Sequence, residues 1–328
     1  MIREVANTRS GATGAQPHPK QESLAKRQWT TFRKNKELFI LSLPALIYIL
    51  VMSYLPMVGV IIAFKQYYDI SGIFGSPWVG LQNFAFFFQS QDAWIVTRNT
   101  VLYNAAFIVF GTVCAVGLAL VMHQVKTSKL LIVYQTVMLL PYFVSWIVVA
   151  YIVYGFLSQQ YGMLNSVVAF LGLKPINWYQ APQYWPVILV FCDLWRRVGF
   201  STLVYFAGIM GLDPTYFEAA IMDGATRWQI ARSITVPMIS NLIVILFILA
   251  VGTIFNADFG LFYFVPNSSP FLSSVTDVIN VFVYNALINT GSIGMAAAVG
   301  LYQSAVGFVL VILTNWIVRR ISPEHSLF

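Results

Sequence analysis

The sequence predicts an all-α membrane protein that crosses the bilayer six times. Of its 328 residues, 58% are hydrophobic and only 9% are charged, whereas a soluble domain has roughly 25% charged residues. Six apolar runs reach the ~20 residues that one helix needs to cross a bilayer, and a helix satisfies its own backbone hydrogen bonds in lipid. The six runs are residues 38–64, 99–122, 130–157, 187–210, 236–256 and 295–318.

The lysines and arginines predict the orientation, because positive residues near span ends stay on the cytoplasmic side. Fourteen of the nineteen fall in the N-terminal tail or directly after spans two, four and six. Both termini are therefore predicted to be cytoplasmic, and the net charge of +7 follows from topology and not from nucleic-acid binding. Lys65, Arg98 and Lys174 lie on the opposite side, and Arg196 and Arg197 lie inside span four.

Residues 1–37 are predicted to form a cytoplasmic tail that precedes a transmembrane domain at residues 38–328. Leu24, Trp29 and Phe32 lie among basic residues, and helical spacing would bring them together, as in a helix lying in the membrane interface. A solvated basic tail that only fixes the topology explains the same residues equally well. The first apolar run exceeds the roughly 7–15 residues of a signal-peptide core, so we expect it to remain as an anchor.

The outward loops are longer than most inward ones and rich in aromatic residues. Trp and Tyr gather at membrane interfaces, which explains them as anchors. The alternative is that these loops cap a pathway or receive an external partner. After span five, residues 275–288 are predicted to form a short amphipathic helix.

The sequence offers no metal or nucleotide site. The histidines His18, His123 and His325 are scattered, and no Gly-x4-Gly-Lys-Ser/Thr loop occurs. Cys114 and Cys192 fall in different spans and are expected to be small buried hydrophobes without a disulfide. We therefore expect this chain to bind no cofactor of its own.

One inward stretch, residues 213–237, is polar whereas its flanks are apolar, and its residues predict a helix, a turn and a second helix. Asp213 and Pro214 are typical of a helix start, and Gly224 permits the turn. A second helix is expected from about Thr226 to Thr235. Ala220 lies four residues before Gly224, so both share a face on which another backbone can approach closely. Docking of a partner and packing on this chain's own helices explain that face equally well.

The spacing in this stretch resembles the EAA loop of binding-protein-dependent ABC importer permeases. That pattern is E-A-A, three residues, G, nine residues and I-x-L-P, and the one departure here is Val in place of Leu, a conservative change. The matching residues are Glu218, Ala219, Ala220, Gly224, Ile234, Val236 and Pro237.

The resemblance extends over most of the chain. WVGLQNF at residues 78–84, followed by Asn99 and Thr100, is similar to the first outward loop of sugar permeases. Residues 255–264, 276–284 and 294–320 resemble the subgroup that imports complex oligosaccharides and polysaccharide fragments. That subgroup is expected to have Gly near Asp258 and Asp near Gly260, so this sequence exchanges the two.

The resemblance implies a permease subunit of a type I ABC importer in the cytoplasmic (inner) membrane of a bacterium. It implies a second permease, more often a different chain, two ATPase subunits that bind ATP and Mg²⁺, and an extracytoplasmic binding protein that delivers an oligosaccharide or polysaccharide, with acidic fragments such as alginate as the first candidate. The chain itself would perform no bond chemistry. Within a coupling loop at residues 211–237, the implied ATPase-coupling residues are Glu218, Ala219, Ala220, Asp223, Gly224 and Arg227.

Span four carries Asp193, Arg196 and Arg197. Arg196 lies about 13 Å from Val187 along a helix, near the middle of a hydrocarbon core about 30 Å thick, where one charge costs about 2.5–3.5 kcal/mol. Asp193 can offset one arginine by its i,i+3 or i,i+4 placement. The other must face a partner, backbone carbonyls or a watery cavity.

Two interpretations of the arginines remain open. In the first, they line a cationic pathway for an anionic or hydroxyl-rich sugar, because a guanidinium matches carboxylate geometry. In the second, which we favour slightly, their role is structural: a salt bridge to the second permease or an adjustment at the helix end that brings the charges to the interface. Weaker pathway candidates are polar or aromatic residues that interhelical packing also explains. They are Asn104, Tyr151, Tyr154, Asn256, Asp258, Asn285 and Gln303.

Two other classes of protein compete with the importer. An ion-coupled secondary transporter of a sugar or other small solute would use membrane carboxylates as ion sites, and only Asp193 lies deep in a span, with Asp258 near the end of another. An intramembrane enzyme is disfavoured, because no His/Glu, Ser/His or carboxylate pair shows suitable spacing.

Overall fold

The computed structural model describes residues 35–125 and 127–321. Its regular elements within those ranges are helices, and the sole strand-like contact there is an isolated antiparallel bridge between Lys65 and Trp78. The all-α prediction is therefore confirmed. The predicted interfacial helix around Leu24, Trp29 and Phe32 lies outside the described residues.

The chain forms two units, residues 1–58 and 59–328. The described part of the first contains α2 (Lys36–Ile49) and a π-helical turn (Leu50–Tyr54), and a 3-10 stretch (Leu55–Phe64) continues into the second unit. This continuous helix of 29 residues confirms the first apolar run as a candidate span. Its side chains from residue 35 to residue 58 are exposed, as expected of an apolar helix that lipid surrounds.

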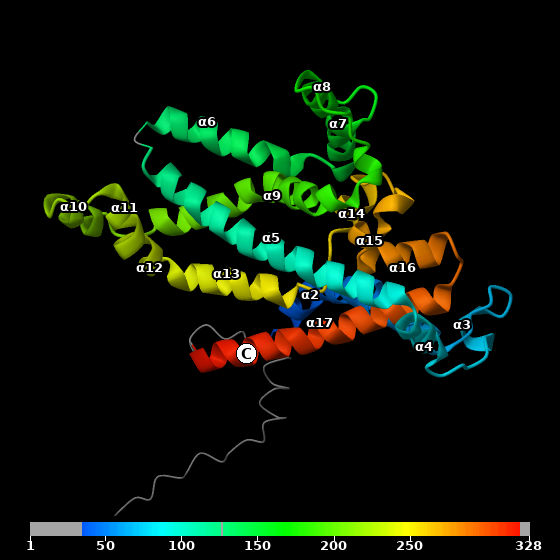
Figure 1. The fold of residues 1–328 in the computed structure, drawn as a ribbon. Coiled ribbons are helices and arrows are strands. Elements are labelled where there is room, and N and C mark those ends of the chain that lie inside the picture. The colour runs from blue at the N-terminus through cyan, green and yellow to red at the C-terminus, as the bar shows by residue number, and fades with distance from the viewer. Residues whose placement is uncertain (1–34, 126, 322–328) are drawn as a thin grey trace, which may run out of the picture. The chain divides into compact units, whose positions relative to one another are not determined.

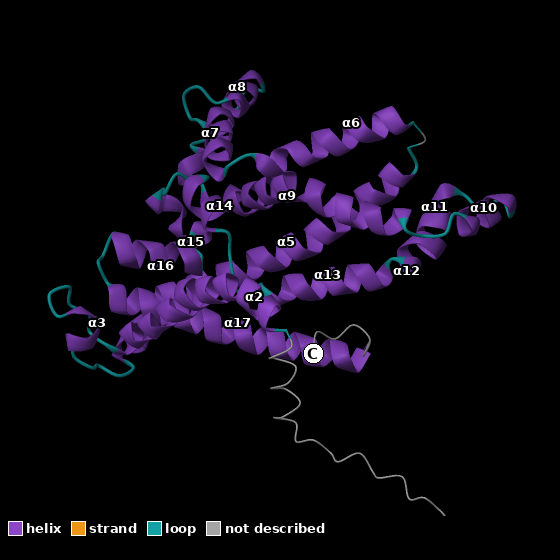
Figure 2. Cartoon of the chain, turned by 180° about the vertical axis from the view of Figure 1, so that it is seen from behind, coloured by secondary structure: helices purple, strands orange, loops and turns teal. Residues whose placement is uncertain are grey.

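The second unit is organised around α5 (Gln91–His123) and α9 (Trp185–Met210), which form its most extensive helix pair. α6 (Ser128–Leu139) packs on α9, and α13 (Ser240–Gly252) packs on α5, α9 and α17 (Ile293–Ile321), as Figures 1 and 2 show. The helix-turn-helix insert lies at one end of α9, and α14 to α16 lie at the other (Figure 1).

Shorter elements complete the unit. The α-helices are α3 (Gly72–Gly75), α4 (Gln82–Gln89), α7 (Trp146–Leu157), α8 (Met163–Phe170), α10 (Thr215–Met222), α11 (Arg227–Ile230), α12 (Val236–Met238), α14 (Phe259–Phe264), α15 (Ser273–Thr276) and α16 (Ile279–Ile288). A π-helical turn spans Ala231–Thr235, and 3-10 turns span Leu140–Phe143, Trp178–Gln180, Pro182–Tyr184 and Pro270–Leu272.

Two of the predicted spans meet a bend: one divides into two helices, and the other is bent near its start. Residues 130–157 divide into Ser128–Phe143 and Trp146–Leu157, which meet at 97°. Pro141 tightens the end of the first half into a 3-10 turn, and Ser145 is extended and caps α7. The second helix of the insert leads into the span predicted at residues 236–256, and there Arg227–Met238 and Ser240–Gly252 meet at 62°. Continuous apolarity indicates length in the membrane but carries no information about a break in helix direction.

Among the described residues, three helices are long and apolar enough to cross a membrane, or up to five if each bent pair is one span. α9 is also 26 residues long, but it contains Asp193, Arg196 and Arg197. Several membrane-spanning helices are therefore present.

The predicted helix at residues 275–288 was also wrong in its continuity, because the chain breaks between α15 and α16. The Asn99 side-chain amide donates to the carbonyl oxygens of Ser274 and Asp277, at 3.2 and 3.0 Å, and the Ile279 amide donates to Thr100 Oγ1 at 3.0 Å. Polar side chains of α5 thus satisfy the backbone groups that the break leaves unpaired.

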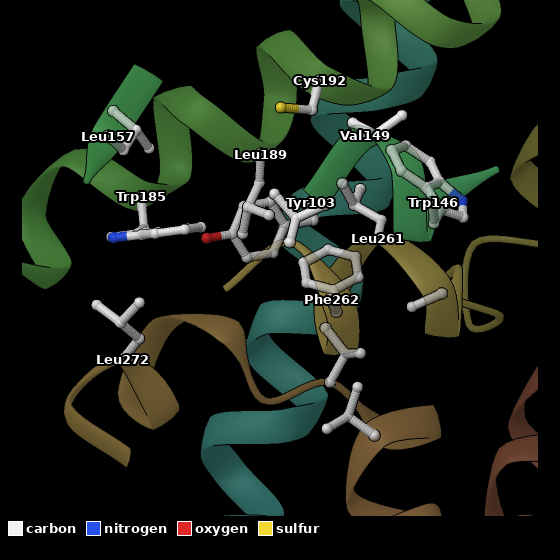
Figure 3. Close-up of a cluster of buried hydrophobic side chains, with 14 residues drawn as sticks. Tyr103, Trp146, Val149, Leu157, Trp185, Leu189, Cys192, Leu261, Phe262 and Leu272 are labelled. Carbon is white, nitrogen blue, oxygen red and sulfur yellow. The ribbon is translucent and has the colours of Figure 1, made fainter. Parts of the chain in front are cut away.

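A hydrophobic cluster joins α5, α7, α9 and α14 (Figure 3). Tyr103, Leu189, Leu261 and Phe262 lie together within it. Cys192 is buried in the same cluster, as expected, whereas Cys114 is exposed, contrary to the prediction, and both thiols are free. The exposure of Cys114 could not be predicted, because periodicity does not distinguish the faces of a uniformly apolar helix.

Asn165 holds together the loop that leads from α7 and α8 back to α9. Its amide nitrogen lies within hydrogen-bond distance of the Ser158, Gln159 and Ile176 carbonyls. Its oxygen accepts from the Ile176 amide at 3.0 Å and from Trp178 Nε1 at 3.1 Å. Asn165 is buried, so these bonds fix the path of the chain just before Tyr179.

We expect Asn165→Ala to lower the stability of the protein. It would leave the buried partners of Asn165 unpaired, at about 1–3 kcal/mol for a group that loses its bond. The apparent unfolding temperature in detergent measures the effect. Asn289→Ala is the control, because the Asn289 side chain is exposed and, within the described part of the chain, bonds only Asn285. Equal shifts in the two variants would contradict the role given to Asn165.

Candidate functional site

A cavity of about 330 Å³ lies between α5, α9 and α13, and we call it the charged cavity. It brings together four of the predicted pathway residues: Asn104, Asp193, Arg197 and Asn256. Two others are placed elsewhere. Tyr151 lines a separate cavity, and Arg196 points elsewhere from α9.

Arg197 lies between two carboxylates. Its Nε is 2.9 Å from Asp193 Oδ1, one turn earlier on α9, and its Nη2 is 2.5 Å from Asp258 Oδ2. The predicted i,i+4 pair is thus confirmed, and Asp258 is a second counter-ion that helical spacing did not predict. Asp193 is buried, whereas about half of the Arg197 side chain is exposed, so the guanidinium remains accessible from the cavity.

Arg196 is stabilised without a carboxylate. Its Nε donates to the Val144 carbonyl at 2.9 Å, and its guanidinium lies over the Trp146 ring at 4.6 Å and over the Tyr142 ring at 5.9 Å. The sequence left three possible environments for this charge, and the structure selects a backbone carbonyl. Val144 lies at the break between α6 and α7, so Arg196 satisfies a carbonyl that the bend leaves free.

Asp258 connects three elements. It caps α14 by accepting from the Gly260 amide at 3.0 Å, and it accepts from Trp146 Nε1 at 2.8 Å besides pairing with Arg197. Gly260 lies against the Trp146 ring, which leaves no room for a Cβ atom. The Asp258–Gly260 order, which departs from the order expected by resemblance, therefore fits this structure.

Asn256 is hydrogen-bonded to a series of further polar side chains. Its oxygen accepts from Asn280 at 3.1 Å, and the Asn280 oxygen accepts from Gln303 Nε2 at 3.0 Å. Asn104 donates to the Thr100 carbonyl at 2.9 Å, which turns its amide nitrogen toward its own helix. The hydrogen bonds that join Asn256, Asn280 and Gln303 connect different segments, and interhelical packing alone would also explain such bonds.

The helix-turn-helix insert has the predicted form. Asp213 Oδ1 accepts from the Thr215 amide and hydroxyl at 2.9 and 2.7 Å, and these bonds hold the pKa of Asp213 below its ordinary value. Gly224 has φ of 77°, the left-handed conformation that ends α10. Thr226 and Gln229 form a reciprocal capping box at the start of α11.

The predicted coupling residues do not all face outward. Ala220 is buried within this chain, as the packing alternative expected, whereas Glu218, Ala219, Asp223, Gly224 and Arg227 are exposed. Large apolar side chains nearby are exposed as well, and none of these was singled out from the sequence. They are Tyr216, Ile221, Met222 and Trp228.

The insert is anchored to the end of α5. The Phe217 and His123 rings lie 4.9 Å apart, and Arg227 Nη1 donates to Gln124 Oε1 at 3.5 Å. Any displacement of α10 therefore acts on α5 as well as on α9.

This chain belongs to the family of binding-protein-dependent transport system inner membrane components, which matches residues 107–323. It is therefore a membrane-spanning permease component of an ABC transport system in the inner membrane.

Relatives of known role cover nearly the whole chain. A polygalacturonan/rhamnogalacturonan transport system permease, YteP of Bacillus subtilis (strain 168), is 32% identical over 91% of this chain and 92% of its own length. The trehalose/maltose permease MalF of Thermococcus litoralis is 26% identical over 86% of this chain and 92% of its own. A crystallised bacterial ABC transporter that imports the acidic polysaccharide alginate has a chain with a TM-score of 0.82 and 30% identity, over 90% of this chain and 99% of that one.

We expect Arg197→Met to destabilise the protein more than Arg196→Met does. The first change leaves Asp193 buried beside Asp258 without a cation, which costs about 3 kcal/mol, the lower end for a broken buried pair, because Arg197 is half-exposed. The second removes one bond to a carbonyl and strands no carboxylate. Apparent unfolding temperatures in detergent compare the two, and a larger loss for Arg196→Met would contradict this account.

Proposed function

We propose that this chain is a permease subunit of an ATP-driven importer that moves an acidic oligosaccharide or polysaccharide by alternating access. The observation that carries the proposal is the continuity of α9. This helix lines the charged cavity with Asp193 and Arg197 and ends about 20 Å further on, immediately before the exposed helix-turn-helix insert. One rigid helix thus joins a candidate substrate site to a candidate docking element.

The proposed partners follow from this arrangement. Two ATPase subunits bind ATP and Mg²⁺ and receive the insert through Glu218, Ala219, Asp223, Gly224 and the exposed apolar residues around them. A second permease, of a different sequence, completes the pathway, and an extracytoplasmic binding protein delivers the sugar. This chain performs no bond chemistry. Closure of the ATPase pair displaces α10, and the anchoring of the insert to α5 and α9 transmits that displacement to the charged cavity.

The chemistry of the cavity supports an acidic cargo. In this region the negative charges of Asp193 and Asp258 equal the positive charges of Arg196 and Arg197. A carboxylate of the sugar would take the place of the Asp258 carboxylate on Arg197. A guanidinium favours such an exchange, because it binds carboxylates in bidentate fashion. The similar crystallised transporter imports the acidic polysaccharide alginate, and the YteP permease belongs to a polygalacturonan/rhamnogalacturonan transport system.

The topology we propose has six spans with both termini cytoplasmic. α2 with its continuation, α5, the bent pair of α6 and α7, α9, the bent pair ending in α13, and α17 supply them. The distribution of lysine and arginine supports this orientation.

Ion-coupled secondary transport is less well supported. It requires a membrane carboxylate that is available to a proton or a sodium ion. Asp193 and Asp258 both pair with Arg197, so neither is available until that arginine moves.

We expect Gly224→Asp to abolish ATP-driven uptake while membrane insertion stays normal. An aspartate strains the left-handed turn and adds a charge to the exposed surface of the insert. Co-purification of the ATPase subunits and sugar uptake in cells measure the effect. Gly291→Asp is the matched control, because Gly291 also has a positive φ, of 62°, but lies outside the insert. Normal uptake by Gly224→Asp would refute the assigned coupling role.

We expect the reconstituted importer to hydrolyse ATP faster with an alginate-loaded binding protein than with a maltodextrin-loaded one. The physical reason is the guanidinium of Arg197, which rewards a carboxylate and offers a neutral sugar only ordinary hydrogen bonds. ATP turnover in liposomes at equal concentrations of loaded binding protein is the measurement. Faster turnover with maltodextrin would overturn the acidic assignment and leave the importer assignment standing.

A further inference from the structure

We propose that a second cavity, which we call the tyrosine cavity, is a subsite for an uncharged face of a sugar ring in the transported oligosaccharide. This proposal rests on the proposed importer function. The cavity has a volume of about 240 Å³ and lies beside α7. Its walls include Tyr151, Tyr154, Tyr179, Phe264 and Asn267, and among the residues that the structure describes no charged one lines it.

The tyrosines are placed to contact a ligand. Tyr151 and Tyr154 lie three residues apart on one face of α7, with exposed fractions of 75% and 49%. The Tyr154 ring is 5.8 Å from the Tyr179 ring, so α7 and the loop before α9 form one aromatic wall. An aromatic face packs against the C–H face of a sugar, while the phenol hydroxyl remains available for hydrogen bonds.

Asn267 adds a polar side chain to the apolar walls of the cavity. This side chain is exposed, on a residue with φ of 54°. A ligand pocket of this kind typically combines apolar walls with a few fixed polar groups.

The walls of the cavity are held in place by the surrounding fold. Ser269 Oγ donates to the Tyr179 carbonyl at 2.8 Å, and the Asn267 amide donates to the Phe264 carbonyl at 3.0 Å. Trp178, next to Tyr179, is bonded to the buried Asn165. The subsite therefore exists before any ligand binds, which lowers the entropic cost of binding.

The tyrosine cavity and the charged cavity are linked through Trp146. This residue starts α7, bonds to Asp258 and supports Arg196. Tyr151 and Tyr154 follow it on the same helix, at about 8 and 12 Å along the axis. A chain of several sugars can engage both cavities at once, with a carboxylate on Arg197 and a ring on the tyrosines, whereas a short one engages them in turn. The tyrosine cavity would thus contribute to selection by length.

The test uses the complete importer with its second permease, ATPases and binding protein, and compares import of alginate pentasaccharide with import of alginate trisaccharide. We expect the double variant Tyr151→Ala/Tyr154→Ala to raise KM for the pentasaccharide about tenfold, with kcat nearly unchanged and a smaller effect on the trisaccharide. Tyr151→Phe/Tyr154→Phe should stay close to wild type, because the rings remain. Tyr161→Ala is the matched control, since Tyr161 is exposed but lies outside the cavity.

Several outcomes would overturn the subsite. These are an unchanged KM in the alanine variant, an equal effect on both sugars, or a phenylalanine variant as impaired as the alanine one. Loss of the second permease on purification of the alanine variant would instead show that the tyrosines form a subunit interface. If the wild-type importer moved neither sugar with ATP, the proposed function itself would fail. If the wild-type importer moved both sugars with ATP and the tyrosine variants did so equally well, only the subsite proposal would fail.

Discussion

A charge inside an apolar helix must find compensation, and this requirement on α9 organises the second unit. Arg197 draws Asp258, and therefore the start of α14, against the helix, with Asp193 as its second counter-ion. Arg196 draws the Val144 carbonyl and the Trp146 ring against the next helical face. The ends of α6, α7 and α14 thus meet at two adjacent arginines, because an uncompensated charge at this depth is costly.

The contacts that compensate the arginines also determine where the residues of the two cavities lie. The bend between α6 and α7 exposes a backbone carbonyl, which Arg196 satisfies, and it turns α7 by 97° from the direction of α6. That direction places Tyr151 and Tyr154 in a cavity separate from the one that contains Arg197. Under the proposed function, Asp258 is the carboxylate that a carboxylated sugar would replace on Arg197.

The site was only partly readable from the sequence. Spacing along one helix identified the Asp193–Arg197 pair, because i,i+4 neighbours are fixed by helical geometry. Asp258 was noted only as a weak candidate, although it is the other carboxylate near a span, since nothing local relates it to residue 197. Trp146 was missed, because its role depends on a bend that apolar composition does not reveal. In the insert, the turn at Gly224 was predicted, but the burial of Ala220 against this chain needed the packed structure.

The sequence alone determined the class of the protein, its apolar segments and the helix-turn-helix form of the insert, and it predicts the orientation. Composition, positive-charge distribution and helix-capping residues are local properties, and each acts through a few neighbouring positions. The tertiary structure decided where the spans bend, which carboxylates pair with Arg197, and that the charged and tyrosine residues line two cavities instead of one. Those features depend on contacts between segments more than fifty residues apart, and no periodicity within a segment encodes such contacts.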